Sequence, residues 1–232
     1  MKHLVKALFA GGMLACSAAA FAEFAGNVSL ATDYVFRGIS QTDEDPAVQG
    51  GFDFTHQSGF YVGVWGSSVD FGGDENVEID YYGGLTGAVG GGLGWDVGVI
   101  YYSYPDADDD DLDYWEVKGA LSYAFQGVAL SPTLGLGVYY SPEFTGETGD
   151  AVYVVGSLDL SLPQAFGLSL HVGQQSIDET DPDSYIEYGV GISKAIAGFD
   201  LALDYYATDD DGEDFAGALA DDRVVFSVAR SF

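Results

Sequence analysis

Cysteine and basic residues are scarce in this sequence. Its 232 residues contain one cysteine, and seven lysines and arginines stand against 37 aspartates and glutamates, so the formal net charge at pH 7 is −30. A single cysteine cannot form a disulfide within the chain. Nucleic acid is excluded as a partner, because phosphate binding requires a basic protein surface.

The N-terminal segment is predicted to be a secretory signal peptide. Lys2 and Lys6 precede an apolar run over residues 7–20, and Ala-Phe-Ala closes the segment as a cleavage site. The run is too short to span a membrane as a helix. We therefore predict that residues 1–22 are cleaved and that residues 23–232 form one mature domain.

Cys16, the only cysteine, lies inside this predicted signal peptide. An alternative is that Cys16 becomes a lipidated N-terminus, although Met13-Leu14-Ala15 before it fits the lipoprotein pattern poorly. Cleavage leaves no thiol in the mature chain. It also removes two lysines and leaves a net charge of −32, with 37 acidic residues against five basic ones: Arg37, Lys118, Lys194, Arg223 and Arg230.

The mature sequence has no stretch that resembles a long amphipathic or transmembrane helix. The full sequence has 16 tyrosines and 15 phenylalanines, of which only Phe9 and Phe21 lie in the predicted signal peptide, and this argues against disorder, since disordered chains are poor in aromatic residues. Apolar and polar residues alternate instead with the two-residue period of β-strands. Twelve such segments are predicted, at residues 24–39, 48–56, 60–71, 77–89, 93–104, 114–125, 128–140, 151–162, 166–177, 185–194, 199–207 and 223–232.

The predicted strands are joined alternately by tight turns and by longer, mostly acidic loops. An even strand number with this asymmetry is typical of outer-membrane barrels. In residues 166–177, Phe166, Leu168 and Leu170 alternate with small or polar residues, so one face suits lipid and the other an aqueous lumen. We predict an all-β fold, a transmembrane antiparallel β-barrel of about 12 strands with short periplasmic turns and longer extracellular loops. The alternative is a soluble β-sandwich or barrel whose apolar face forms the core.

The chain ends on an aromatic residue at the end of an alternating strand. Val224, Phe226, Val228 and Phe232 share one face, as in the closing strand of outer-membrane barrels. Arg230 occupies a position that prefers an apolar residue, and its long side chain can reach the membrane interface. We predict that this strand pairs with the first one. We also predict that it engages the barrel-assembly machinery of the Gram-negative outer membrane, where the barrel contacts lipid and lipopolysaccharide.

Charged side chains on the predicted inner face are the candidate functional residues. They would line a wet lumen whose excess of acids favours cations, as charged rings do in pores. The alternative is a lumen closed by internal salt bridges, in which Arg37, Lys118 and Arg223 pair with neighbouring acids. The predicted pore-lining residues are Asp33, Arg37, Asp53, Glu78, Asp80, Asp96, Glu116, Lys118, Asp159, His171, Glu187, Asp200, Asp204 and Arg223.

Calcium binding and catalysis are two further interpretations. Ca²⁺ takes several carboxylate oxygens, but the acidic clusters lack the ligand spacing of an EF-hand loop. Hydrolysis needs a base near a nucleophile or a water, and only His56 and His171 remain after cleavage, neither beside an obvious serine at the outer rim. Neither a cofactor nor an enzyme is predicted. The candidate calcium residues are Asp108, Asp109, Asp110, Asp111, Asp209 and Asp211.

Residues 31–42, Ala-Thr-Asp-Tyr-Val-Phe-Arg-Gly-Ile-Ser-Gln-Thr, resemble the opening of the TorF family of proposed outer-membrane porins. The likeness continues through Gly50-Gly51-Phe52-Asp53 and residues 59–65, and in size and strand number it covers essentially the whole mature chain. The resemblance implies an outer-membrane β-barrel that forms a pore. It supplies no catalytic residue and no established substrate.

The sequence thus predicts an outer-membrane channel for the passive diffusion of small solutes, with a preference for cations. The alternative is a non-conducting structural or adhesive barrel that acts through its acidic extracellular loops.

Overall fold

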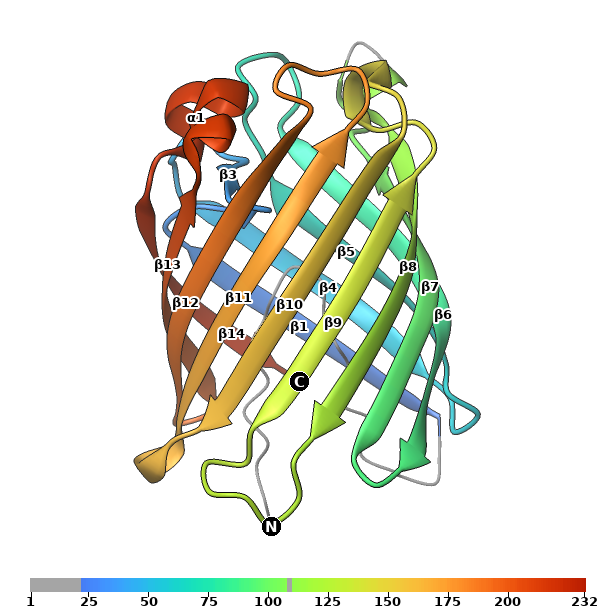
Figure 1. The fold of residues 1–232 in the computed structure, drawn as a ribbon, viewed down its shortest axis with the longest axis vertical. Helices are drawn as coiled ribbons and strands as arrows, with labels where there is room; N and C mark the ends of the chain where they lie inside the picture. The colour runs from blue at the N-terminus through green and yellow to red at the C-terminus, as the bar shows by residue number, and fades with distance from the viewer. Residues whose placement is uncertain (1–21, 108–109) are drawn as a thin grey trace.

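The computed structural model describes residues 22–107 and 110–232, where the chain forms a closed antiparallel β-barrel of twelve strands (Figure 1). The predicted signal peptide, up to residue 21, and the calcium candidates Asp108 and Asp109 lie outside the described residues. The barrel strands are β1 (Glu23–Ala31), β4 (Ala47–Thr55), β5 (Phe60–Ser68), β6 (Val77–Gly90), β7 (Leu93–Ser103), β8 (Tyr114–Ala124), β9 (Thr133–Ser141), β10 (Ala151–Ser161), β11 (Phe166–Ile177), β12 (Ser184–Ile196), β13 (Phe199–Thr208) and β14 (Arg223–Ser231).

The sheet closes because β1 pairs with both β4 and β14. Each of the other barrel strands pairs with its neighbours along the chain, so the barrel has no free edge. Closure satisfies the backbone hydrogen bonds of the outermost strands, which no other arrangement of strands achieves in lipid. The strand number, the antiparallel pairing and the pairing of the first strand with the last one are confirmed.

Helical structure is confined to the connections. No helix in the described part of the chain is long and apolar enough to cross a membrane. The helix α1 (Asp210–Ala216) starts after Asp209, whose side chain accepts a hydrogen bond from the Gly212 N–H as an N-cap. The single turns of 3₁₀-helix are η1 (Asp110–Leu112), η2 (Thr145–Glu147), η3 (Pro163–Ala165) and η4 (Gly217–Ala220).

The barrel is apolar outside and polar inside. On the outer face Leu30 and Phe52 are 58% and 63% exposed, whereas Glu116 and Glu187 on the inner face are 1% and 0% exposed. A soluble barrel would bury its apolar face and expose its acids. The inverted arrangement is that of a barrel surrounded by lipid, and it argues against the soluble alternative.

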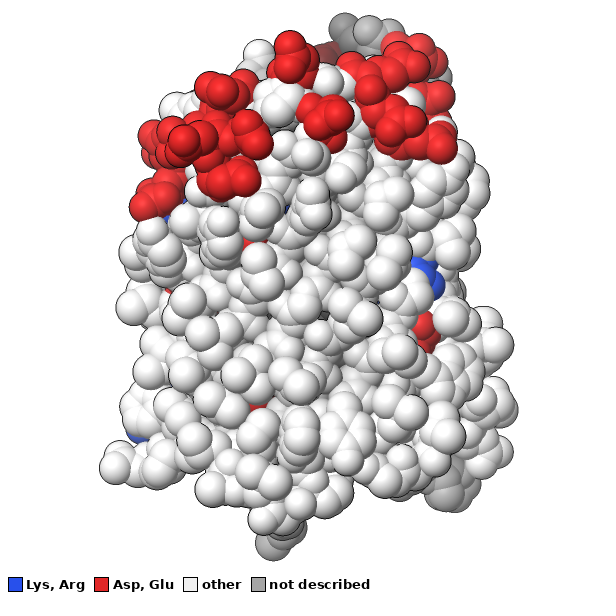
Figure 2. Space-filling view, viewed as in Figure 1, with Lys and Arg blue, Asp and Glu red and all other residues white. Residues whose placement is uncertain are grey.

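The two ends of the barrel differ in the length and charge of their connections. We call the end with the short turns, such as residues 56–59 and 197–198, the turn end, and the opposite end the loop end. Acidic residues cover the loop end, over α1 and the neighbouring loops, whereas the visible wall below them is almost free of charge (Figure 2). The acids are therefore segregated from the apolar wall.

The first connection departs from the prediction. A strand was expected over residues 24–39, but β1 ends at Ala31. The following residues fold into the mouth of the barrel as a hairpin of β2 (Val35–Phe36) and β3 (Ile39–Ser40) (Figure 1). The physical reason is the turn at Arg37 and Gly38, whose φ angles of 49° and 85° cannot continue a strand. We call residues 32–46 the inward hairpin.

The connection between β8 and β9 is also longer than expected. The strand predicted to begin at residue 128 begins at Thr133, because Leu130 and Ser131 have φ angles of 64° and 44°. These two residues therefore form a turn rather than the start of a strand. The other strand boundaries agree closely with the predicted ones.

Phe232 closes the seam between the first and last strands at the turn end. Its N–H donates to the Gly26 carbonyl and its carbonyl accepts from the Gly26 N–H, both at 2.9 Å. The Phe232 ring lies over Gly26, where a Cβ would be only 2.6 Å from the ring, and its centroid is 6.3 Å from that of Phe52. The terminal residue is thus part of the ladder and of the outer wall.

Deletion of Phe232 is expected to lower the stability of the refolded barrel in detergent. The deletion removes two backbone hydrogen bonds, each worth about 1 kcal/mol net, together with the ring packing on Gly26. Urea unfolding followed by tryptophan fluorescence measures the change. Phe232→Tyr keeps both bonds and the ring and is the matched control. Equal midpoints for the deletion and the full chain would contradict this role of Phe232.

Candidate functional site

The inward hairpin carries Arg37 into the barrel interior. Its tip packs against the wall so closely that a Cβ on Gly38 would lie 2.8 Å from both Glu187 Cβ and Thr208 Cγ2. Both the positive φ angle and this lack of space require glycine at position 38. The tip is therefore fixed against β12 and β13, and this fixes the direction in which the Arg37 side chain leaves it.

Arg37 is held by polar groups from two strands. Its Nη2 donates to both carboxylate oxygens of Glu116 on β8, each at 2.7 Å. Its Nη1 donates to Oε1 of Gln175 on β11 at 2.7 Å. Glu116 and Gln175 are each only 1% exposed. Charge-assisted hydrogen bonds of this length are among the strongest in proteins.

Aromatic rings surround the same guanidinium. Its Cζ lies 4.4 Å from the ring centre of Tyr153, 4.6 Å from that of Phe36 and 5.4 Å from that of Tyr139, with Phe144 at 6.0 Å. Cations are attracted to aromatic faces at such distances. We call the groups that the barrel contributes the Arg37 socket: Glu116, Tyr139, Phe144, Tyr153 and Gln175.

Arg37 keeps its charge in this buried place. Burial by itself lowers the pKa of the guanidinium, but the Glu116 carboxylate beside it more than compensates, so the pKa stands above its ordinary value. Removing only one partner of a buried ion pair leaves the other uncompensated, which costs about 3–5 kcal/mol. Arg37 and Glu116 therefore depend on each other.

A second ion pair fixes the base of the inward hairpin to the opposite wall. Asp33 Oδ2 accepts from Nη1 of Arg223 on β14 at 2.9 Å. Asp33 Oδ1 accepts from the hydroxyls of Ser40 and Thr42, which ties the two arms of the hairpin together. In the closed order of strands, β14 and β8 are six positions apart in either direction. The hairpin and the side chain of Arg37 together therefore connect opposite sides of the lumen.

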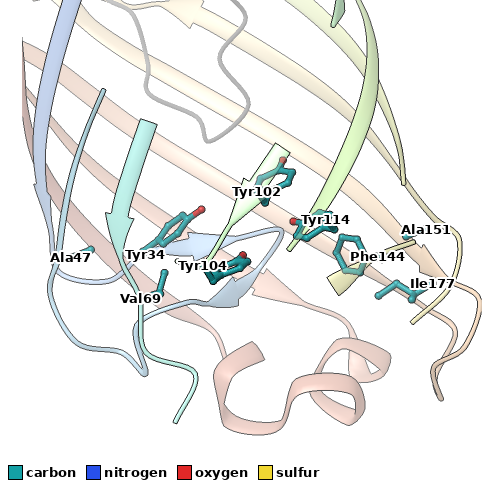
Figure 3. Packing of buried hydrophobic residues seen from close by; sticks show 9 residues of the cluster. All are labelled: Tyr34, Ala47, Val69, Tyr102, Tyr104, Tyr114, Phe144, Ala151 and Ile177. Atoms are coloured by element: carbon teal, nitrogen blue, oxygen red, sulfur yellow. The ribbon is translucent and has the colours of Figure 1, made fainter. Parts of the chain in front are cut away.

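Tyrosines fill the space around the inward hairpin. The hydroxyls of Tyr34 and Tyr104 donate to the two oxygens of Glu78 at 2.8 and 2.7 Å, and that of Tyr102 donates to Glu116 at 3.1 Å. These rings belong to a buried cluster inside the loop end (Figure 3). The cluster and the hairpin together narrow the lumen there. The cluster consists of Tyr34, Ala47, Val69, Tyr102, Tyr104, Tyr114, Phe144, Ala151 and Ile177.

The three inward bases all pair with acids. Besides the two pairs of the hairpin, Lys118 Nζ lies 3.2 Å from Asp96 Oδ1. The alternative of a lumen closed by salt bridges predicts this pairing. The three pairs involve only three of the inward acids. Among the described residues, the other inward carboxyl groups have no lysine or arginine partner, so acids outnumber bases on the inner wall.

Several of these carboxylates accept hydrogen bonds from neutral groups or histidine. Glu187 accepts from the Tyr153 hydroxyl at 2.6 Å, and its other oxygen lies 2.8 Å from His171 Nε2. Asp53 accepts from the Tyr82 hydroxyl at 2.7 Å. These contacts hold the acids in place without supplying a lysine or arginine to balance them.

Four further inward acids have no lysine or arginine partner in the described part of the chain, although Asp159 and Asp204 interact electrostatically with His171. Within the described residues, Asp159, Asp200 and Asp204 form no ion pair. Oδ1 of Asp80 is buried without a hydrogen-bond partner in the same part of the chain. Water and mobile cations are the natural partners of such groups.

All fourteen predicted site residues lie inside the barrel, but two of them belong to the inward hairpin and not to a barrel strand. The prediction placed Asp33 and Arg37 on a strand, whereas both belong to the inward hairpin. The structure brings Arg37 together with Glu116, Asp33 with Arg223, Asp96 with Lys118, and His171 with Glu187. Asp200 and Asp204 lie on β13 and form no ion pair with lysine or arginine among the described residues, and Asp204 interacts electrostatically with His171.

The sequence prediction missed the uncharged part of the socket. Tyr139, Tyr153 and Gln175 lie on the inward positions of their strands, between exposed residues such as Val138 and Val152. The same alternation that identified the acids would have found them. Only charged residues and a histidine were selected, so these partners were passed over.

The calcium candidates and His56 form no centre in the part of the chain that the structure describes. No group of three or more histidine, cysteine, aspartate or glutamate residues there is arranged to hold a metal ion. Asp209 caps α1 and also accepts from the Ile186 N–H at 3.0 Å, and Asp211 is exposed. The ring Nδ1 of His56 lies 2.8 Å from the Ser58 hydroxyl of its own turn and accepts from the Ser58 backbone N–H.

The sequence matches one family model over nearly its whole length. Residues 15–232 match the model of a bacterial protein of unknown function, Gcw_chp. The sequence matches none of the curated proteins.

Several solved outer-membrane proteins are similar in structure. The KdgM porin has a TM-score of 0.58 at 9% identity, with 90% of this chain and 99% of that chain covered. An outer-membrane channel from Pseudomonas putida F1 has a TM-score of 0.50 at 13% identity, covering 93% and 97%. LpxR from Salmonella typhimurium has 0.50 at 9%, covering 90% and 99%. At these identities the likeness shows the fold alone, a closed outer-membrane β-barrel.

Proposed function

The chain belongs to the Gcw_chp family of bacterial proteins of unknown function, and we propose that it forms a channel for passive diffusion of small solutes across the Gram-negative outer membrane. The observation that carries this proposal is the closed barrel with an apolar outer wall and charged inner wall. The fold is that of the KdgM porin. The resemblance of residues 31–42 to the TorF family of proposed porins supports the same function.

We propose that the channel prefers cations. Asp159, Asp200 and Asp204 lie on the inner wall and form no ion pair with lysine or arginine within the described residues. The acidic surface at the loop end attracts cations to the mouth (Figure 2). The KdgM porin is described in complex with disordered oligogalacturonate, an acidic sugar. The charge of the wall here favours the opposite sign of solute.

The proposal includes export and assembly. Residues 1–22 act as a cleaved signal peptide, and the strand that ends in Phe232 engages the barrel-assembly machinery. The acidic loops face lipopolysaccharide, with divalent cations between their carboxylates and the lipid phosphates. Arg230 lies on the outer wall near the turn end, with its Cζ 5.3 Å from the Phe199 ring centre, which suits a side chain at the membrane interface.

One observation favours a second candidate function. The inward hairpin spans the lumen between β14 and β8, so a barrel that never opens would be non-conducting. Such a barrel would act as a structural or adhesive protein through its acidic loops.

Single-channel recording in a planar bilayer with a salt gradient distinguishes the two candidates. The refolded mature protein is expected to give discrete current steps, because its strands form a continuous sheet around a charged lumen. The reversal potential is expected to have the sign of cation preference. Absence of steps from protein shown by circular dichroism to be β-folded would favour the structural barrel. Steps without cation bias would keep the channel and exclude the electrostatic argument.

A further inference from the structure

The Arg37 socket belongs almost entirely to the barrel wall. Glu116, Tyr139, Tyr153 and Gln175 lie on the consecutive strands β8, β9, β10 and β11, and Phe144 lies in the connection between β9 and β10. Of the groups around the guanidinium, only Phe36 comes from the hairpin itself. The socket therefore persists as a recess in the wall when its occupant leaves.

The chemistry of the socket is specific for a guanidinium group. A buried carboxylate accepts two hydrogen bonds, a glutamine carbonyl oxygen accepts a third, and the ring of Tyr153 lies 4.4 Å from the cation. A planar, charged group with several fixed donors satisfies all of these at once, whereas a lysine-type ammonium does not. The wall thus recognises the group rather than the hairpin that presents it.

Arg37, which occupies the socket, lies in a turn whose backbone conformation is unfavourable for arginine. Arg37 has a φ angle of 49°, a region that residues other than glycine seldom adopt. Only two residue pairs hold the hairpin together as a sheet, Val35 with Ser40 and Phe36 with Ile39. Arg37 has one advantage over a free solute: it is covalently attached to the hairpin, which keeps it close to the socket at high effective concentration. A free solute with the same group can compete without the strain.

A further acidic side chain, that of Asp80, lies beside the socket. Asp80 is 9% exposed, and its Oδ1 has no hydrogen-bond partner in the described chain. Asp80 lies opposite Tyr102 in the β6–β7 ladder, and the Tyr102 hydroxyl donates to Glu116. The carboxyl group of Asp80 therefore lies next to Tyr102, which itself contacts the Glu116 carboxylate.

We propose that the Arg37 socket is a binding site for solutes that carry a guanidinium group, and that Arg37 occupies it as an internal stand-in. The site deepens the proposed channel function, because it names the chemical class of solute that the lumen would admit. Binding of the solute displaces Arg37 and with it the hairpin.

The test removes the stand-in and supplies its group from solution. Arg37→Gly is the variant of choice, because glycine adopts the positive φ angle and keeps the turn while the side chain is lost. Methylguanidinium chloride at millimolar concentration is the probe, with equal sodium chloride and methylammonium chloride as controls. The readout is the thermal unfolding temperature of the refolded mature barrel in detergent, followed by circular dichroism.

We expect methylguanidinium to raise the unfolding temperature of Arg37→Gly above that in either control salt, and to raise that of the wild type much less, because Arg37 competes for the socket. In the double variant Arg37→Gly, Glu116→Gln the apparent affinity should fall by about tenfold or more, because the charged acceptor is lost. No response of Arg37→Gly, a response equal to that of the wild type, or a response that survives Glu116→Gln would each overturn the proposal.

A second variant covers the case in which Arg37→Gly does not fold. Replacing residues 32–46 by Asn-Gly removes the whole hairpin and leaves the wall of the socket intact, so the same response is expected. Binding in detergent requires no ion flow. A failed conductance experiment therefore leaves the site standing, and a failed binding experiment leaves the channel standing.

Discussion

A barrel without its inward hairpin is expected to conduct several-fold more current per channel than the wild type. Ala31 and Ala47 lie directly opposite each other in the β1–β4 ladder, so replacing residues 32–46 by Asn-Gly joins the two strands by a short turn. The replacement removes the segment that spans the lumen between β14 and β8. Single-channel recording in symmetrical salt measures the change.

The matched control shortens another connection at the loop end. Residue Ile177 donates its N–H to the Asp183 carbonyl, so residues 178–182 can likewise be replaced by Asn-Gly. No hydrogen bond or ion pair joins this loop to the inward hairpin among the described residues. Its removal should leave the conductance unchanged. Equal conductance of the hairpin-deleted barrel and the wild type would show that the constriction lies elsewhere.

Neutralising the unpaired acids of the inner wall is expected to abolish most of the cation preference. The variant Asp159→Asn, Asp200→Asn, Asp204→Asn removes three charges that have no basic partner in the described chain. Glu116 is left in place because Arg37 already neutralises it. The reversal potential under a tenfold salt gradient should move most of the way towards zero.

Acids at the mouth provide the comparison for this experiment. The variant Asp178→Asn, Asp181→Asn, Asp183→Asn removes the same number of charges from an exposed loop. Exposed charges are screened over about 10 Å at 0.1 M salt, so this variant should shift the reversal potential much less. A larger shift from the loop variant than from the wall variant would place selectivity at the mouth.

The barrel was predictable because its signal repeats along the chain. Residues 166–177 form β11 with the predicted bounds, and the alternation between apolar and small or polar side chains over residues 166–173 is that of a strand. Chain closure was predictable as well, since Phe226, Val228 and Phe232 match the pattern of a closing strand.

The inward hairpin was not predictable from local pattern. Val35, Phe36 and Ile39 favour strands, and both β2 and β3 are in fact strands. The alternation of apolar and polar residues does not predict the direction of the chain, which folds into the lumen and turns at Arg37 and Gly38. That direction depends on distant groups, Glu116 and Arg223, which come close only after the barrel has closed.

The socket illustrates the same limit. Its charged member, Glu116, was among the predicted residues, while Tyr153 and Gln175 were not. Alternation shows which side of the wall a residue faces, but not its height or its neighbours across the lumen. Those depend on the strand number and on the register, such as the pairing of Tyr153 with Gln175 in the β10–β11 ladder.

The bond between Asp33 and Arg223 also sets an order of events during biogenesis. The two residues are separated by 190 positions, and Arg223 lies on β14, the strand whose pairing with β1 closes the barrel. Contacts so distant in sequence form late, because a long stretch of chain must be ordered first. The hairpin therefore docks fully only when the final strand is in place. A half-assembled barrel therefore lacks the constriction that the hairpin forms, and the lumen narrows only when the barrel closes.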